Sequence, residues 1–161
     1  MMNTPPEHLA RHLSHHFGAL GIDPSEGADP VAVAREMAPR AQTLKELAQL
    51  SEFFYRDPET FDENAAKKHL RPVALEALEH SRDGLAALAD WNGEAIHALV
   101  AEISERLGVG MGKVAQPLRV AVSGRAATPG IDVTLELVGR DACLRRIEKA
   151  IEFVRARAEN A

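Results

Sequence analysis

The chain has few cysteines, few aromatic residues and no long apolar run, and each shortage excludes a class of protein. Of its 161 residues, 4% are aromatic and only Cys143 is a cysteine. A single cysteine excludes an internal disulfide and any cysteine-rich zinc or iron–sulfur site. No apolar run approaches the length of about 18 residues that a membrane-spanning helix needs, and no secretory leader opens the sequence. We therefore expect a cytoplasmic protein without membrane contact.

Signatures of catalysis are also missing. The sequence has no nucleophile elbow, phosphate-binding loop, dinucleotide fingerprint or zinc-protease motif. Cys143 stands in an expected helix without a neighbouring base, which favours a small core residue over a nucleophile. Carboxylates are plentiful, but their neighbours mark none of them as an acid–base pair. The sequence predicts no catalytic residue.

Two clusters near the N-terminus have alternative interpretations. His8, His12 and either His15 or His16 lie one or two turns apart on the first expected helix, a spacing that suits a transition metal. No cysteine or inward carboxylate completes such a site, so a solvated helix face is favoured and no metal is expected. The aromatic residues at 53–55 suit stacking on bases, but adjacent aromatics on a helix usually pack into a core.

What the sequence does have is a repeated pattern of helix starts. A Ser, Thr, Asp or Asn stands before a proline or three residues before a glutamate, and apolar residues then recur at helical spacing. Leu9, Leu13, Phe17 and Leu20, which follow Thr4, are one example. No segment has a convincing two-residue alternation, so we predict an all-α fold without a substantial sheet. The expected helices begin near residues 4, 29, 43, 62, 72, 92, 111, 128 and 141.

These helices are expected to form two consecutive small bundles. The polar segment at 56–63 (RDPETFDE) is the best candidate for their boundary. We therefore assign residues 1–58 to an N-terminal bundle and residues 59–161 to a C-terminal bundle. Within the second, the helix expected at 111–122 should kink or restart at Pro117, which has no backbone N–H to donate.

Charge is distributed unevenly along the chain. The net charge of -5 argues against a protein that coats nucleic acid by bulk electrostatics. Residues 106–131 nevertheless contain no Asp or Glu. The cations of this acid-free segment are Arg106, Lys113, Arg119 and Arg125. A surface that is rich in donors and free of acids suits phosphates and base edges, and a solvated face of four spaced cations is the equally weighted alternative.

The same segment carries a family resemblance. Residues 112–124 (GKVAQPLRVAVSG), followed by TPGI at 128–131 and ELVGR at 136–140, closely resemble the C-terminal anticodon-binding region of bacterial glutamyl-tRNA synthetases. These enzymes are class I aminoacyl-tRNA synthetases. The resemblance extends upstream through Trp91, DENAAKKHL at 62–70, TLKEL at 43–47 and the Pro-Arg at 39–40.

The resemblance implies two helical anticodon-binding domains, and it implies that tRNA(Glu) binds through its anticodon loop. Family members activate glutamate with ATP and Mg in a Rossmann domain that carries HIGH-like and KMSKS-like motifs. Neither motif occurs here, so the resemblance implies a chain that does not aminoacylate alone and has no cofactor of its own. The catalytic domain of the full-length enzyme is the second implied partner. DNA is not a partner, and a monomer is expected.

The resemblance also assigns roles to individual residues. In the family, an arginine before the Thr-Leu-Lys-Glu box contacts the third anticodon base, and it matches Arg40. The residues that match the readers of the first two bases are Arg119, Thr128, Pro129 and Ile131. Lys113 and Arg125 are candidates for contacts with the RNA backbone. Some members have an arginine where this chain has Ala101, so one contact is expected to be missing.

The chemistry of arginine supports the role implied for Arg40. Glutamate anticodons end in C and glutamine anticodons end in G. The Watson–Crick edge of C offers the acceptors O2 and N3 to a guanidinium, which has only donors, whereas G presents mainly donors there. A good bidentate contact contributes about 1–3 kcal/mol of discrimination. The alternative function from another class is a helical protein–protein interaction module that does not bind RNA.

Overall fold

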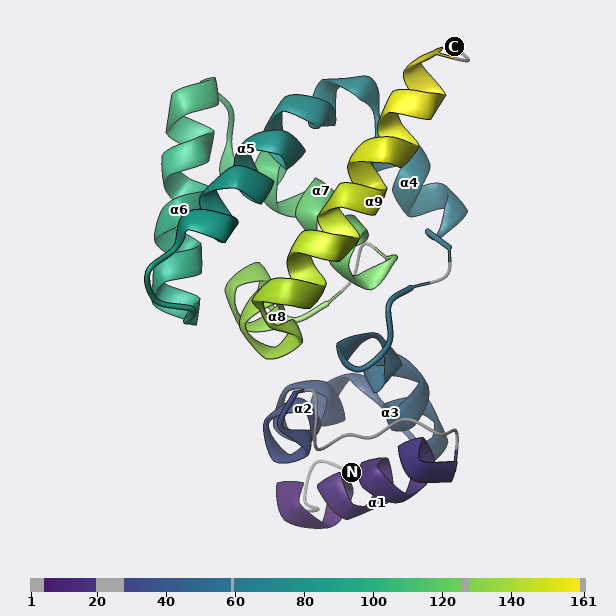
Figure 1. Ribbon diagram of the computed structural model, residues 1–161. Coiled ribbons are helices and arrows are strands. Elements are labelled where there is room, and N and C mark those ends of the chain that lie inside the picture. Colours follow the sequence, from purple (N-terminus) through teal and green to yellow (C-terminus); the bar gives the residue numbers. More distant parts are fainter. Residues whose placement is uncertain (1–4, 20–27, 59, 126–127, 160–161) are drawn as a thin grey trace. The chain divides into compact units, whose positions relative to one another are not determined.

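The computed structural model describes residues 5–19, 28–58, 60–125 and 128–159. Over these ranges the chain is entirely helical and has no strand, so the prediction of an all-α fold is confirmed (Figure 1). Among the described residues, no helix is both long and apolar enough to cross a membrane. The expected cap Thr4 and the stripe residue Leu20 lie outside the described residues.

Nine α-helices and three short 3-10 helices make up the described ranges. The α-helices are α1 (Pro6–Ala19), α2 (Pro30–Met37), α3 (Leu44–Ser51), α4 (Glu63–His69), α5 (Leu75–Ala87), α6 (Gly93–Leu107), α7 (Met111–Ser123), α8 (Ile131–Val138) and α9 (Arg140–Glu159). The 3-10 helices are η2 (Ala38–Arg40), η3 (Glu52–Phe54) and η4 (Pro72–Ala74). The helix expected from residue 72 thus begins as η4 and continues as α5.

Side-chain caps explain where several helices begin. The Asp29 carboxylate accepts a hydrogen bond from the N–H of Val31 at 3.2 Å, and the Thr43 hydroxyl accepts one from Glu46 at 3.0 Å. Asp62 caps α4 and Asn92 caps α6 in the same way. Such caps satisfy backbone donors that the first turn of a helix leaves without partners. The sequence pattern that predicted these starts therefore reflects real hydrogen bonds.

Helix α7 runs through Pro117 without interruption from Met111 to Ser123. The alternative of a restart at Pro117 is wrong. Tertiary packing offsets the lost hydrogen bond, because Val114, Leu118 and Val122 are all buried along the same helix. Pro117 still has no N–H to donate, so the Lys113 carbonyl lacks its helical donor.

The chain divides into two compact units, Met1–Arg56 and Asp57–Ala161. In the first unit, α1, α2 and α3 pack on one another. Phe53 and Phe54 are buried in its core, which confirms the core interpretation of this aromatic run. The Tyr55 ring lies 4.8 Å from the Phe17 ring, and burial raises the pKa of the Tyr55 hydroxyl well above its ordinary value.

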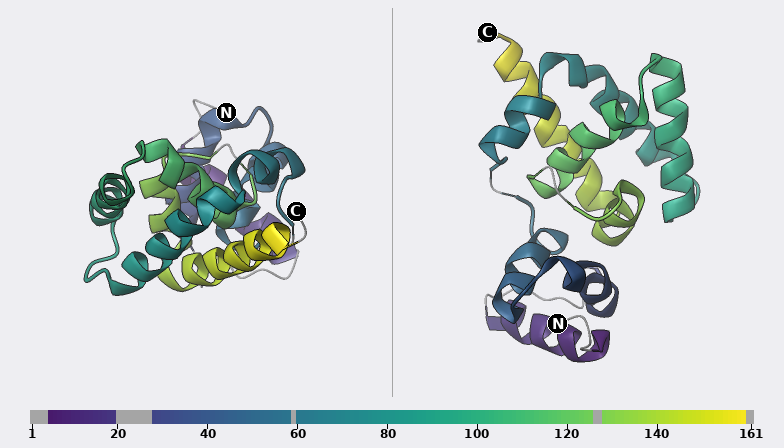
Figure 2. Two further views of the ribbon diagram at one scale, coloured as in Figure 1. Left: turned by 90° about the horizontal axis from the view of Figure 1, so that it is seen from above. Right: turned by 180° about the vertical axis from the view of Figure 1, so that it is seen from behind.

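In the second unit, α7 is the central helix. It contacts α4, α5, α6, α8 and α9, and Figures 1 and 2 show it lying among them. The connection before α6 is fixed to the α8–α9 corner through Trp91. Its Nε1 donates a hydrogen bond to the Leu135 carbonyl at 3.2 Å, and the Arg140 guanidinium lies 5.4 Å from its ring centroid. Helix α7, which carries most of the acid-free segment, therefore packs against five other helices of the unit.

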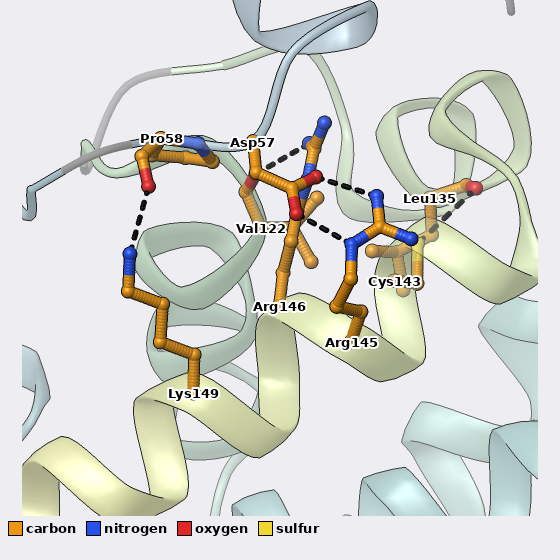
Figure 3. A network of polar contacts seen from close by, with 8 residues as sticks. All are labelled: Asp57, Pro58, Val122, Leu135, Cys143, Arg145, Arg146 and Lys149. Atoms are coloured by element: carbon orange, nitrogen blue, oxygen red, sulfur yellow. Dashed lines mark hydrogen bonds and ion pairs between the residues drawn. The ribbon is translucent and has the colours of Figure 1, made fainter.

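A charged clamp holds the start of the second unit on α9 (Figure 3). The Asp57 carboxylate accepts hydrogen bonds from Arg145 Nε at 2.5 Å and from Arg146 Nε at 2.8 Å. Lys149 donates to the Pro58 carbonyl at 3.2 Å. Hydrogen bonding to Arg145 is the main cause that lowers the pKa of Asp57 to about 2. Residues 57 and 58, which we assigned to the first bundle, thus make these contacts with α9.

Gly124 lets the chain pass closely over the end of α7. Its φ of 79° is left-handed, and its carbonyl accepts a hydrogen bond from the N–H of Asp62 at 2.7 Å. A Cβ at this position would lie 3.0 Å from the Pro58 Cβ and 3.1 Å from the Thr60 carbonyl oxygen. Both the backbone angle and the crowding require glycine here.

We predict that Asp57→Asn lowers the free energy of unfolding of the second unit by about 1–2 kcal/mol near neutral pH, a value discounted for partial exposure. The folded pKa of Asp57 is depressed, so its contribution is present above the unfolded pKa of about 4 and is lost as the pH falls toward about 2. Urea unfolding followed by emission of Trp91, the only tryptophan, measures this unit. A gap between variant and wild type that stays constant down to the lowest pH would contradict the clamp. Asp90→Asn, at an exposed position, is the control.

We also predict that Gly124→Ala destabilises the second unit more than Gly108→Ala does. Gly108 caps α6 at a similar φ of 68° but a Cβ there would meet nothing within 4 Å. The left-handed backbone costs about 1–2 kcal/mol in both variants, and only Gly124→Ala adds crowding against a backbone oxygen. Urea midpoints monitored at Trp91 compare the two. Equal losses would show that the crowding at residues 58–60 relaxes without cost.

Candidate nucleic-acid interface

The acid-free segment does not form one continuous surface strip. Arg106, at the end of α6, forms an ion pair with Glu102 at 2.9 Å and lines a shallow groove between α5 and α6. Lys113 is exposed in the first turn of α7, and Arg119 is half-buried two turns later. Arg106 therefore lines a different groove from Lys113, and a carboxylate of its own helix lies beside it.

Cations from the end of α4 and from the residue before η4 lie near those of α7. Burial and then the positive charges of four side chains lower the pKa of His69 below its ordinary value. The four are Lys68, Arg71, Arg119 and Lys113, which we call the cation cluster. The sequence analysis missed Lys68 and Arg71 because they lie more than 40 residues upstream of Lys113 and Arg119. Only the packing of α4 and η4 against α7 brings them together.

Hydrogen bonds from α9 fix the C-terminal end of α4 beside the cation cluster. Arg157 of α9 donates hydrogen bonds to the carbonyls of Ala66 at 3.0 Å and Leu70 at 3.5 Å. The Ala66 carbonyl also accepts the backbone N–H of Leu70, the residue that caps α4, so Arg157 adds a second donor at this helix end. Lys68 lies in the same turn, where a positive charge also interacts favourably with the helix dipole. The basic end of α4 is thus a fixed element of the second unit.

The turn before α8 buries the side chains that were expected to face a ligand. Thr128, Pro129 and Ile131 are all buried, and Gly130 is exposed. The Thr128 hydroxyl donates a hydrogen bond to the Pro129 carbonyl at 2.8 Å, and Thr134 donates to the same carbonyl at 3.1 Å. The sequence alone does not reveal that these two hydroxyls donate to a buried carbonyl. Any contact that this turn makes with a ligand must use backbone groups.

A negatively charged side chain lies at the start of α8, which distinguishes this helix end from a simple anion-binding site. A Cβ built on Gly130 would lie 2.8 Å from Asp132 Oδ1, so the Asp132 carboxylate sits at this helix end. Its negative charge offsets the positive end of the helix dipole, which would otherwise favour phosphate. The turn is better suited to groups that donate hydrogen bonds, such as the amino groups of bases.

The remaining predicted residues occupy different places. Arg40 is exposed at the end of η2 in the first unit, three residues before Thr43, which caps α3. Arg125 is half-buried after Gly124, and its N–H donates to the Ser123 hydroxyl at 3.2 Å. Ala101 is half-buried in α6.

The other clusters considered from the sequence have no role in this surface. His8, His12 and His15 are exposed, and the described residues contain no group of three or more side chains placed to hold a metal ion. Cys143 is a core residue, as predicted. Its Sγ donates to the Leu135 carbonyl at 3.6 Å, and burial raises the pKa of the thiol to about 12.

The described residues form a helical fold whose second unit gathers a cluster of cations, an arrangement typical of modules that bind anionic partners. The chain belongs to the anticodon-binding domain family of glutamate–tRNA ligases: a family model described as an anticodon binding domain matches residues 8–151. Among similar proteins, glutamate–tRNA ligase 2 of Halorhodospira halophila is 48% identical over 155 residues, which cover 96% of this chain and 33% of that protein. Glutamate–tRNA ligase 1 of Alkalilimnicola ehrlichii is 48% identical over 154 residues, with the same two shares.

Solved structures of glutamate–tRNA ligases also superimpose on this chain. A glutamate tRNA ligase from Elizabethkingia meningosepticum, in complex with its amino acid, superimposes with a TM-score of 0.83 at 26% identity. The match covers 94% of this chain and 30% of that one. The glutamate–tRNA synthetase of Elizabethkingia anophelis gives a TM-score of 0.78 at 27% identity over 94% of this chain and 29% of that one. The chain therefore spans about a third of the length of the ligases, and this part is their C-terminal third.

We predict that Lys68→Gln and Lys113→Gln each raise the pKa of His69 toward its ordinary value of 6.5, because each removes a nearby positive charge. Titration of the imidazole resonances by NMR measures the effect. Lys45→Gln, at an exposed position in the first unit, should leave the titration of His69 unchanged. Overlapping curves for all three variants and the wild type would show that the cations do not act on His69.

Proposed function

We propose that this chain is the anticodon-reading part of a glutamate–tRNA ligase and binds the anticodon loop of tRNA(Glu). The observation that carries the proposal is the cation cluster at the end of α4, before η4 and on α7, in a chain that has an overall net charge of -5 and belongs to this family. A catalytic domain outside this sequence would attach glutamate, with ATP and Mg as its cofactors. The ligase would act in the cytoplasm, and this chain would be a monomer.

Arg40 is the proposed reader of the third anticodon base. Its side chain is exposed and makes no hydrogen bond or ion pair with the described residues. Five N–H donors and no acceptor suit the O2 and N3 acceptors of C better than the N1–H and amino donors of G. The proposal thus explains how one residue separates glutamate tRNA from glutamine tRNA.

Arg119 and the 128–131 turn are the proposed readers of the first two bases. Arg119 would contribute its guanidinium, whereas the buried Thr128, Pro129 and Ile131 would shape the turn and contribute backbone groups. Lys113 and Arg125 would contact the RNA backbone. The Asp132 carboxylate beside Gly130 supports a contact with base donors at this turn.

We predict that Arg40→Gln reduces the preference for a stem-loop whose anticodon ends in C over one that ends in G. The preference should fall by about fivefold or more, because a bidentate base contact contributes about 1–3 kcal/mol of discrimination. Anisotropy titrations of the two labelled stem-loops measure the ratio. The matched control is Arg35→Gln, which removes the same charge from an exposed position on α2. An unchanged ratio in Arg40→Gln would remove Arg40 from the site, and a wild-type chain that binds neither RNA would refute the function.

A further inference from the structure

A groove in the second unit lies beside the cation cluster. It is a groove of about 700 Å³ between the end of α4, η4, the start of α5, the α6–α7 connection and the first half of α7. We call it the α4–α7 groove. No role of the predicted anticodon readers requires it, since none of Arg40, Arg119 or the 128–131 turn lines it.

The rim of the groove is positively charged. Lys68, Arg71 and Lys113 line it, and all three side chains are exposed and form no ion pair with the described residues. One carboxylate, that of Glu76, also lines it, and this side chain is 72% exposed and lies 3.9 Å from His80 Nε2. Three cations against one solvated carboxylate favour an anionic group at the rim.

The walls of the groove are apolar and unusually open to solvent. Val73 is 79% exposed and Val109 is 41% exposed, and both line the groove from opposite elements, η4 and the α6–α7 connection. Ala77 and Leu107 continue the apolar lining. Flat apolar faces of a ligand would cover this surface, and nucleobases have such faces.

Hydrogen-bond acceptors lie on the α7 side of the groove. Gln116 lines it, and its Oε1 is buried without a hydrogen-bond partner among the described residues. One turn earlier, the Lys113 carbonyl lacks a helical donor because Pro117 has no N–H. A buried acceptor without a partner is costly, so a ligand that donates an N–H gains affinity here.

These features together select a nucleotide. Free phosphate fits the rim but has no N–H for Gln116, and an apolar ligand fits the walls but not the cations. A nucleotide has an anionic group, a flat apolar face and, on most bases, an amino or imino donor. The groove is also continuous with the proposed RNA surface, since Gln116 precedes Arg119 by about one turn of α7 and His69 senses both Arg119 and Lys113.

We propose that the α4–α7 groove binds one unpaired nucleotide of the tRNA that lies next to the anticodon bases in the loop. The phosphate lies among Lys68, Arg71 and Lys113, the base packs on Val73 and Val109, and a base N–H donates to Gln116. This inference rests on the proposed function, and its test separates the two.

The first experiment measures the phosphate contacts. The affinity of the full chain for the stem-loop that ends in C is measured by anisotropy at several salt concentrations, for wild type and for Lys68→Gln/Arg71→Gln. Loss of two phosphate contacts should weaken binding and flatten the slope of log K against log salt by about 1.4. The matched control, Arg106→Gln/Arg155→Gln, removes the same charge from two exposed ion pairs elsewhere in the unit and should keep the slope.

The second experiment locates the base. An abasic residue is placed in turn at each loop position outside the anticodon, and each RNA is titrated with wild type and with Gln116→Leu. Gln116→Leu should weaken the intact RNA about fivefold, the usual effect of one lost hydrogen bond. At one loop position the abasic RNA should bind Gln116→Leu as well as it binds wild type. Gln116→Glu, which keeps an acceptor, should retain more of the affinity than Gln116→Leu.

The outcomes distinguish the groove from the function. If wild type prefers the stem-loop ending in C while the slope of Lys68→Gln/Arg71→Gln stays unchanged, the groove proposal is wrong and the anticodon function stands. The proposal is also overturned if Gln116→Leu weakens binding of every abasic RNA by the same factor as it weakens binding of the intact RNA. If wild type binds no stem-loop, the function itself is wrong. Trp91 emission during urea unfolding identifies any variant that fails to fold.

Discussion

The buried guanidinium of Arg146 is the interaction on which the geometry of the second unit depends. Its side chain is 3% exposed, so its charge must be compensated inside the protein. Asp57 provides the opposite charge, and the Val122 carbonyl accepts a second hydrogen bond at 2.8 Å. One residue of α9 therefore holds both the beginning of the unit and the last turn of α7. The ion pairs with Arg145 and Arg146 also compensate the negative charge of Asp57.

The position of α7 matters because this helix carries one half of the cation cluster while α4 and η4 carry the other. Like charges gathered at one place repel each other, and burial first and then these cations lower the pKa of His69. An anion that enters the cluster relieves this repulsion, so binding and folding are linked in this unit. Contacts of Arg157 and Arg146 and the buried face of α7 thus hold the cations together. The proposed anionic ligand would bind a cluster that is already formed.

The sequence predicted what depends on local interactions and missed what depends on the packing of distant segments. The helix starts at Asp29, Thr43 and Asp62 were predictable because each cap bonds to a backbone N–H two or three residues away. The role of Lys68 depends on a contact between α4 and α7, and no local pattern records it.

Thr128 marks the limit of inference from residue type. A threonine at a helix start was a reasonable candidate to face a ligand, yet its hydroxyl bonds inward to the Pro129 carbonyl. Whether a polar side chain turns toward solvent or toward the core depends on competing acceptors, here a carbonyl that Thr134 also uses. The turn is therefore shaped by buried polar contacts, and in the proposed complex its backbone groups would meet the RNA.

Affinity and discrimination have different physical origins in the proposed complex. The cation cluster acts on phosphates, which every RNA sequence presents, and its contribution weakens as salt displaces the released counterions. Arg40 acts on a base edge, and the preference for C over G is a ratio of two affinities that share the same phosphate contacts. The salt-dependent part cancels in that ratio. A chain with a negative overall charge can therefore be selective at physiological salt, provided that a few cations are held together and one arginine is left exposed.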